Sequence, residues 1–307
     1  MSALSRRRTR RVIDGVLLLD KPYGITSQAA VTRARNRLEA AKTGHTGTLD
    51  PMATGLLPLA FGEATKFAQT LLDADKTYCA TVRLGTTTTT GDLEGEVLST
   101  QPVDVDRTQI EAAITQFRGE IEQTPPMYSA LKHAGKPLYE YARAGSEIER
   151  SPRRITVTAL DIEAWEGEEE VRLRIECSKG TYVRVLAEDI GRALGCGATL
   201  AALRRIRVGR FRVEDALTLE AWSQMNEAQM LATLLPVDAL LVGMPSFELD
   251  AEQSLRMAQG QAVELARAMD AGLVRVYAPG AHFLGVADVT PEGRLSPRRM
   301  VSARSNA

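Results

Sequence analysis

Cysteine and histidine are scarce in this chain of 307 residues, with three of each. Cys79, Cys177 and Cys196 include no CxxC pair, so we expect reduced thiols in a reducing compartment rather than a disulfide framework. The histidines lie far apart in the sequence and form neither an HExxH motif nor a Cys/His cluster. A zinc site built from protein side chains is therefore not expected.

Long apolar runs are also missing. No stretch approaches the ~20 apolar residues that a helix needs to cross a bilayer. The apolar patch from Val16 to Leu19 follows a basic N-terminus, but Asp20-Lys21-Pro22 ends it, and it is too short for the core of a signal peptide. We therefore expect a cytoplasmic protein with no membrane partner.

Lysine is rare too: it contributes only seven of the 38 basic residues, and the other 31 are arginines. The net charge of -1 argues neither for nor against a nucleic-acid partner. The arginines gather in three clusters, at Arg6 to Arg11, at Arg33, Arg35 and Arg37, and at Arg204, Arg205, Arg207, Arg210 and Arg212. Such clusters can bind phosphates even when acidic residues elsewhere balance the charge, although solvated surface faces are the commoner explanation.

The length predicts about two domains. The segment Gly243-Met244-Pro245-Ser246 is typical of a boundary. We expect a large domain over residues 1–245, whose first 12 residues form a loose basic arm, and a small β-rich domain over residues 246–307. The only low-complexity stretch, Thr86 to Thr90, is interpreted as a loop beside a strand.

Hydrophobic periodicity predicts helices and paired strands without a regular βαβ rhythm. Ser27 is the expected cap of the first helix, and Gly119 and Gly195 are the expected ends of two others. The expected helices cover residues 28–40, 63–72, 110–118, 183–194 and 251–258, and the expected strands cover residues 16–19, 76–84, 155–162, 171–177, 274–277, 283–289 and 300–302. This order favours an α+β fold over a doubly wound α/β fold.

Asp50 lies in a constrained loop with Gly44, Gly47 and Gly55 around it and Pro51 directly after it. A residue before proline avoids the helical region, so the local backbone is restricted. The flanking residues are mostly apolar. A carboxylate held in such a loop is either a turn-forming residue or a nucleophile, and the turn is the commoner role when the residue is considered alone.

The whole string around Asp50 changes that balance, because it resembles the catalytic signature of the TruB-type tRNA pseudouridine synthases. The similar strings run in order from about residue 13 to about residue 240: Leu19-Asp20-Lys21-Pro22 with Thr26-Ser27, Gly44-His45-Thr46-Gly47-Thr48-Leu49-Asp50-Pro51-Met52-Ala53-Thr54-Gly55 with Leu57-Pro58, Gln123-Thr124-Pro125-Pro126-Met127-Tyr128-Ser129-Ala130-Leu131-Lys132, Ser178-Lys179-Gly180-Thr181-Tyr182-Val183-Arg184, and Leu203-Arg204-Arg205. One departure is Thr89, which stands where the family pattern usually has an acidic residue.

The resemblance implies that the protein isomerises uridine in RNA to pseudouridine. The base is detached at its N-glycosidic bond, rotated and rejoined through C5, so no atoms are gained and no cofactor is expected. Asp50 is implied as the nucleophile, because a carboxylate with an ordinary pKa of about 3.9 is ionised at neutral pH. The resemblance leaves open whether Asp50 attacks C6 of the ring, attacks C1′ of the sugar, or removes a sugar proton.

The matched motifs also imply roles for other residues. Arg184 resembles the arginine that pairs with the catalytic carboxylate, and Tyr78 resembles the tyrosine that stacks on the target base and moves a proton. The other implied substrate-binding residues are Tyr182 and Leu203, which line the uracil pocket, His45, which meets the flipped nucleotide or fills its vacated place, and Lys21, which shapes the floor of the site. Without the resemblance, Tyr78 and Leu203 are ordinary core residues, Arg184 a surface residue, and His45 a structural one.

The family substrate implied for this chain is uridine 55 in the T-arm of tRNA, and no obligate protein partner is evident. A paired or stacked base has to be flipped out to reach Asp50, which gives the arginine clusters a role in positioning the RNA. The resemblance also likens the C-terminal domain to a PUA-type RNA-binding domain. Two rivals remain open: a non-catalytic RNA-binding protein or tRNA-folding factor on the same scaffold, and a carbohydrate hydrolase, which would need a second positioned acid that no matched motif supplies.

Overall fold

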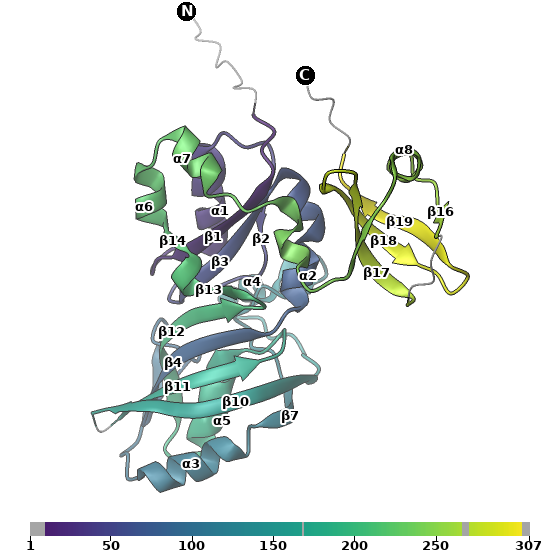
Figure 1. Ribbon diagram of the computed structural model, residues 1–307. Helices are drawn as coiled ribbons and strands as arrows, with labels where there is room; N and C mark the ends of the chain where they lie inside the picture. Colours follow the sequence, from purple (N-terminus) through teal and green to yellow (C-terminus); the bar gives the residue numbers. More distant parts are fainter. Residues whose placement is uncertain (1–9, 168, 266–269, 303–307) are drawn as a thin grey trace, which may run out of the picture.

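A computed structural model of the protein describes residues 10–167, 169–265 and 270–302, so most of the expected basic arm lies outside the described residues. The chain is organised around a large mixed sheet, with a smaller sheet formed by its C-terminal part (Figure 1). The expected α+β class is confirmed. Within the described residues, no helix is both long enough and apolar enough to span a membrane.

The large sheet has the strand order β14-β1-β3-β12-β4-β11-β10-β7, with β2 paired to β3 and β13 paired to β12. Its strands are β1 (Gly15–Lys21), β2 (Thr43–His45), β3 (Thr54–Phe61), β4 (Lys76–Leu84), β7 (Gly119–Gln123), β10 (Arg153–Glu166), β11 (Glu170–Cys177), β12 (Ala198–Val208), β13 (Phe211–Arg212) and β14 (Leu217–Thr218). Two pairs, β1 with β14 and β3 with β12, are parallel, and the remaining pairs are antiparallel. The parallel β3–β12 pair joins the two halves of the sheet.

On β4 and β11 one face is apolar and the other is largely polar, as strand alternation predicts, whereas β1 and β3 are buried on both faces. On β4 the side chains of Tyr78, Ala80, Val82 and Leu84 are buried. The helix α5 (Val183–Leu194) packs against β12 and β4 on this buried face, and α3 (Arg107–Thr115) packs against α5 and β10 (Figure 1). Gly195 ends α5 in the left-handed conformation at φ 81°, as expected for a C-terminal glycine.

The other half of the large sheet carries the remaining helices of the N-terminal part. The helix α1 (Ser27–Arg37) contacts β2 and α6, and the 3-10 helices η1 and η3 lie against β1. The further elements of the part before residue 246 are η1 (Gly62–Phe67), α2 (Ala68–Asp73), β5 (Thr86–Thr88), β6 (Val97–Thr100), β8 (Lys132–His133), β9 (Lys136–Pro137), α4 (Leu138–Arg143), η2 (Val213–Asp215), α6 (Leu219–Gln224), α7 (Glu227–Ala232) and η3 (Val237–Leu241).

The C-terminal part forms its own five-stranded sheet, with the order β15-β17-β18-β19-β16 and a separate small core. Its elements are β15 (Ser246–Glu248), α8 (Ala251–Ala258), β16 (Val263–Glu264), β17 (Gly272–Ala278), β18 (His282–Val289) and β19 (Arg294–Met300). The junction with the N-terminal part is packed: the rings of Phe67 and Phe283 meet edge to face with centroids 5.6 Å apart, and Tyr277 donates a 2.7 Å hydrogen bond to Asp238.

Several local expectations are wrong for identifiable reasons. Thr26, rather than Ser27, caps α1, because Ser27 turns inward to bond with Leu49. Thr86–Thr88 is a short strand paired with β6, and the last strand covers residues 294–300 rather than 300–302. Gly119 begins β7 at φ 90°, after α3 has already ended at Thr115. The Ser27–Leu49 contact spans 22 residues of the chain, so local patterns did not reveal it, whereas the other differences involve neighbouring segments.

Candidate active site

Asp50 lies in the loop between β2 and β3, and neighbouring segments hold this loop on both sides of it. Ser27 Oγ accepts from Leu49 N at 2.8 Å and lies 3.0 Å from Leu49 O. Gly24 N donates to Pro51 O at 2.9 Å, and Lys21 Nζ donates to the same oxygen at 3.3 Å. The residues directly before and after Asp50 are therefore fixed, while the Asp50 side chain remains 38% exposed.

Arg184 is the partner of this carboxylate. Its Nε lies 3.1 Å from Asp50 Oδ2, and its side chain is only 5% exposed. The two terminal nitrogens donate to backbone oxygens, Nη1 to Thr90 O at 2.8 Å and Nη2 to Tyr128 O at 2.6 Å. Because every nitrogen of the guanidinium has a partner, its orientation is fixed, and a charge-assisted bond orients the Asp50 carboxylate in turn.

A second carboxylate, Asp92, also belongs to this centre, although the sequence motifs did not identify it. Its Oδ2 lies 3.5 Å from Arg184 Nε, and its side chain is 4% exposed. Its Oδ1 accepts from Thr90 Oγ1 at 2.5 Å and from Glu94 N at 3.1 Å. Asp92, which is buried, thus helps to balance the buried charge of Arg184. The only local signal was an acidic residue in the loop after the Thr-rich stretch.

Tyr78 and Leu203 lie on the neighbouring strands β4 and β12, and both side chains are 8% exposed. They belong to the same buried cluster as Leu49 and Met52 of the Asp50 loop. Burial raises the pKa of the Tyr78 phenol, and the nearby Arg205 guanidinium lowers it in part. The phenol therefore stays protonated at neutral pH, as a proton donor beside a charged carboxylate.

Arg205 is the other residue that motif reasoning left without a role. It is 1% exposed, and its guanidinium donates to three carbonyl oxygens of the segment 47–56: Leu56 O at 2.8 Å, Gly47 O at 3.1 Å and Thr48 O at 3.4 Å. In the register of β12 and β4, Arg205 lies directly opposite Tyr78. Arg205 therefore connects the Asp50 loop with the tyrosine.

His45 and Tyr182 border the site from two further elements. His45 Nδ1 accepts from Gly47 N at 3.3 Å, and burial, together with Arg205, lowers the pKa of the imidazole. It is therefore neutral at pH 7, with the proton on Nε2. Tyr182 directly precedes α5; its backbone is bound by the Gln123 amide, and the Arg153 guanidinium lies 4.9 Å from its ring centroid. Neither side chain has a hydrogen bond to Asp50 within the described chain.

Lys21 lies behind the loop rather than at its surface. Its side chain is fully buried, and Nζ donates to Ile25 O at 2.8 Å and Pro22 O at 3.0 Å in addition to Pro51 O. Burial lowers the pKa of its ammonium to about 8. This position forms the floor beneath Asp50 and offers no route for direct contact with a ligand.

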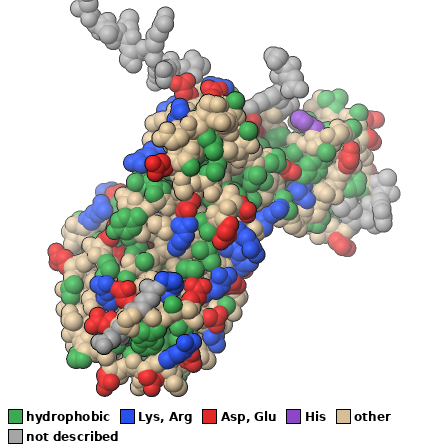
Figure 2. All heavy atoms as spheres, turned by 60° about the vertical axis from the view of Figure 1, so that its left-hand side comes forward, with side chains coloured by type: hydrophobic (Ala, Val, Ile, Leu, Met, Phe, Trp, Pro, Cys, Tyr) green, Lys and Arg blue, Asp and Glu red, His purple; other side chains and the backbone are tan. Residues whose placement is uncertain are grey.

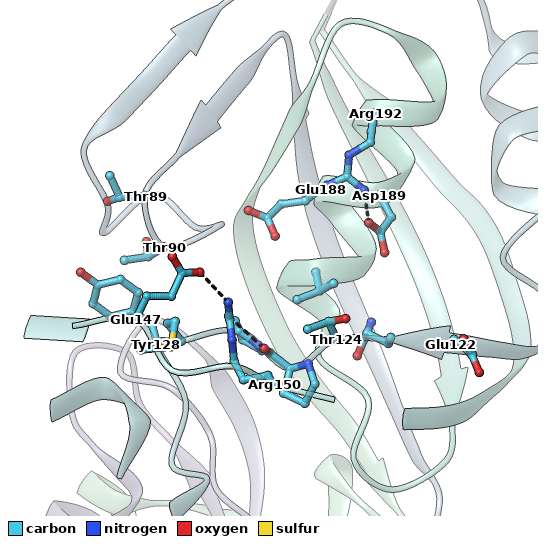
Figure 3. Close-up of a pocket in the computed structure, with 15 residues that line it drawn as sticks. Thr89, Thr90, Glu122, Thr124, Tyr128, Glu147, Arg150, Glu188, Asp189 and Arg192 are labelled. Atoms are coloured by element: carbon cyan, nitrogen blue, oxygen red, sulfur yellow. Dashed lines mark hydrogen bonds and ion pairs between the residues drawn. The ribbon is translucent and has the colours of Figure 1, made fainter. Parts of the chain in front are cut away.

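A cleft of about 520 Å³ lies on the far side of the Arg184 contacts, where Thr90 and Tyr128 form part of its wall (Figure 3). Thr89 also borders this cleft, and its hydroxyl accepts from Glu96 N at 3.1 Å. Glu188 and Asp189 project from α5 toward the same space, and burial raises the pKa of Glu188. Asp50 is not among the residues that line this cleft, so the cleft adjoins the carboxylate centre.

Comparison with known proteins defines the class to which this fold and site belong. Residues 35–183 match the model of the TruB family pseudouridylate synthase N-terminal domain, residues 184–242 match the tRNA pseudouridylate synthase B C-terminal domain, and residues 245–301 match the pseudouridine synthase II TruB C-terminal model. Each of these three segments is thus similar to a part of a pseudouridine synthase. The chain belongs to the TruB family of pseudouridylate synthases.

Curated relatives and solved structures agree with this assignment. The chain is 56% identical over 301 residues to a tRNA pseudouridine synthase B of Aromatoleum aromaticum, covering 98% of this chain and 97% of the relative, and 54% identical to that of Azoarcus sp. over 98% and 99%. A chain of a Cbf5–Nop10–Gar1 complex has 26% identity and a TM-score of 0.70 over 94% of this chain and 84% of its own. A chain of an H/ACA RNP bound to a substrate RNA has 24% identity and a TM-score of 0.71 over 94% and 86%, which shows a shared fold.

Proposed function

We propose that this enzyme isomerises uridine to pseudouridine in the T-arm of tRNA, at position 55, with Asp50 as its nucleophile. The observation that carries the proposal is the 3.1 Å contact between Asp50 and Arg184 in a loop that stays open to solvent. The relatives named tRNA pseudouridine synthase B, which are 54–56% identical over nearly the whole chain, support tRNA as the substrate.

The arrangement suits the chemistry of this isomerisation. The bond between N1 of uracil and C1′ of ribose breaks, the base rotates, a bond forms between C5 and C1′, and the proton leaves C5 while N1 gains one. Arg184 keeps Asp50 oriented through these steps, and an oriented nucleophile is the main requirement of such a reaction. The protonated phenol of Tyr78 lies under the base and exchanges a proton with it.

The remaining residues would hold the base and its surroundings. Leu203 supplies an apolar surface for the uracil ring, and the Tyr182 ring, with Arg153 against it, forms one edge of the entrance. His45, a neutral donor, takes up the space that the flipped nucleotide leaves in the stem-loop. Lys21 acts indirectly, because it supports the loop from below.

Exposed basic residues would contact the phosphates and position the RNA. The arginine cluster at residues 204–212 divides in this respect: Arg204 is paired with Asp20 and Arg205 is buried, whereas Arg210 and Arg212 are exposed. On the face drawn in Figure 2, basic and acidic side chains are intermingled. Contacts with the RNA would therefore be local, in keeping with the net charge of -1.

We further propose that residues 1–245 form the catalytic domain and residues 246–307 an RNA-binding domain of the PUA type. The C-terminal sheet has its own core, and Arg294, Arg298 and Arg299 on β19 are exposed. The packed junction holds this sheet in a fixed position beside the catalytic part. A second contact with the tRNA, away from the reacting base, would add salt-sensitive affinity independent of sequence.

The two rival functions have less support. A non-catalytic RNA-binding protein or tRNA-folding factor has no need for a carboxylate beside a polyanion, and the Asp50–Arg184 pair would serve no purpose there. For a hydrolase, Asp92 cannot protonate a leaving group, because its side chain is 4% exposed and bonded to Arg184, Thr90 and Glu94. Glu94 is exposed and its pKa is raised by partial burial, Asp92 and Asp50, but the 54–56% identical relatives are named tRNA pseudouridine synthases, which favours isomerisation.

The test is incubation of the purified protein with tRNA transcribed from 5-tritiated uridine, in which release of tritium reports rearrangement at C5. We expect release of one tritium per tRNA, which disappears when uridine 55 is replaced by cytidine in the transcript. Release that persists in the cytidine transcript would refute the T-arm assignment, and binding without release would favour the non-catalytic alternative.

A further inference from the structure

Arg205 is an unusual residue to find at the centre of a protein. Its side chain is 1% exposed, and in the described part of the chain no ion pair joins it to a carboxylate. Removing a guanidinium from water costs several kcal/mol unless other groups compensate. Here the compensating groups are the three carbonyl oxygens of the segment 47–56, so the placement of this charge depends on the conformation of that segment.

The contacts of Arg205 close both ends of the Asp50 loop. At one end the guanidinium binds Gly47 O and Thr48 O. At the other end the backbone of Arg205 pairs with Gly55, so closely that a Cβ on that glycine would lie 2.3 Å from Arg205 O. Asp50 lies between these two attachments.

The same side chain also faces the tyrosine of the site. Residues directly opposite in an antiparallel pair project from the same face, and Arg205 lies opposite Tyr78. The other charged or titratable groups that act on the Tyr78 phenol are Cys177 and Asp50, and both oppose its ionisation. Arg205 is therefore the cation that Tyr78 meets within the buried part of the site.

From these contacts we propose that Arg205 is a positioning residue of the reaction, which holds the Asp50 loop closed and fixes the hydroxyl of Tyr78. The proposal rests on the proposed function, since it assigns the geometry of Asp50 and Tyr78 to a third residue. A purely structural arginine would stabilise the whole domain, whereas a positioning residue acts on the segment 47–56 and on the rate of the chemical step.

The first experiment compares Arg205→Met, which keeps an unbranched apolar side chain and removes the donors, with Arg205→Lys, which keeps the charge but not the planar guanidinium. Single-turnover rates and tRNA affinities are measured with enzyme in excess. Because small displacements of a nucleophile cost about 100-fold in rate, we expect Arg205→Met to be slower by about that factor with unchanged tRNA affinity. Arg205→Lys should recover part of the rate. A wild-type rate in Arg205→Met, or a decrease explained by weaker tRNA binding, would overturn the proposal.

The second measurement does not depend on activity. Amide hydrogen exchange of full-length Arg205→Met should increase in peptides covering residues 46–57 and stay at the wild-type level in α5 and in the C-terminal sheet. Uniformly faster exchange would show a general structural role and overturn the proposal. If Arg205→Met does not fold, Arg205→Lys is examined in the same way, and wild-type rate and exchange in that variant would also refute it.

Coupling to Tyr78 is tested by the double variant Arg205→Met with Tyr78→Phe. If Arg205 acts partly through the Tyr78 hydroxyl, the rate of the double variant falls by less than the product of the two single effects. Fully multiplicative effects would overturn this part of the proposal. Arg83→Met on β4 is the matched control, because in the described part of the chain the Arg83 guanidinium binds Glu170 on the open face, and this variant should retain the wild-type rate.

Wild-type activity separates failure of this proposal from failure of the proposed function. If the wild-type protein releases no tritium from tRNA, the function is wrong, whereas the exchange experiment still decides whether Arg205 holds the loop. If the wild type is active and Arg205→Met is equally active, only the role of Arg205 is refuted.

Discussion

Replacing Arg184 by lysine keeps a positive charge beside Asp50 but removes the planar guanidinium, whose N–H donors orient the Asp50 carboxylate. The guanidinium uses all three nitrogens at once, on Asp50 at 3.1 Å, on Thr90 O at 2.8 Å and on Tyr128 O at 2.6 Å. A lysine ammonium has one nitrogen and cannot reach partners that lie on three different segments. Some of these partners, including the partly buried carbonyl oxygens of Thr90 and Tyr128, will be left without a hydrogen bond from residue 184.

The size of the effect follows from the hydrogen bonds that lysine cannot form. A hydrogen bond to a charged group contributes about 1.5–3 kcal/mol, and removing the one to Asp50 corresponds to about a 10- to 150-fold slower chemical step. An unpaired carbonyl costs up to a further ~1–3 kcal/mol in the free energy of unfolding where it is buried, and less where water from the cleft reaches it. We therefore expect Arg184→Lys to fold with reduced stability, to bind tRNA normally and to react slowly.

The assay is single-turnover release of tritium from 5-tritiated uridine in tRNA, combined with urea unfolding of each variant. Arg107→Lys is the control, because Arg107 forms an exposed pair with Glu111 on α3, and such pairs contribute little. A single-turnover rate for Arg184→Lys equal to that of the wild type would show that the charge alone is sufficient. Orientation of Asp50 by the several donors of the guanidinium would then not be required.

Four further predictions concern the same molecule. Asp50→Asn should abolish tritium release and leave tRNA binding intact, since the change is nearly isosteric; substantial turnover would remove Asp50 as nucleophile. Tyr78→Phe should slow the single-turnover rate far more than it weakens binding, and an unchanged rate would leave Tyr78 only a stacking role. Substituting Arg298 and Arg299 together by glutamine in the full chain should weaken tRNA binding. The slope of log affinity against log salt concentration should fall by about one unit for each phosphate that the protein no longer neutralises. An identical slope would assign the C-terminal sheet a structural role only. Finally, burial lowers the pKa of Lys76 from 10.5 to about 8. Between about pH 8 and pH 10.5 the unfolded chain therefore binds more protons than the folded protein, so the free energy of unfolding should rise with pH over this range. Urea unfolding should show a smaller rise in Lys76→Met, and an equal rise would assign the effect to other groups.

The sequence by itself determined several of the regular elements and the identity of the nucleophile candidate. The alternation on β4 separates Tyr78 from Cys79, and Gly195 ends α5, because both signals are local. The Asp50 motif is likewise local, since the glycines and the proline that restrict the loop are its immediate neighbours. Arg184 could be assigned only through resemblance to a family, because nothing near it in the sequence indicates a carboxylate partner.

Only the tertiary structure decided which charges share one buried centre. Asp92 is 92 residues from Arg184 in the chain, and the two meet at 3.5 Å because the loop after β5 folds over the start of α5. Arg205 appeared in the sequence as one of a cluster of surface arginines, yet it is enclosed by a loop about 150 residues earlier in the chain. Whether a charge is buried depends on which residues pack around it in space, and the neighbouring residues in the sequence do not indicate that packing.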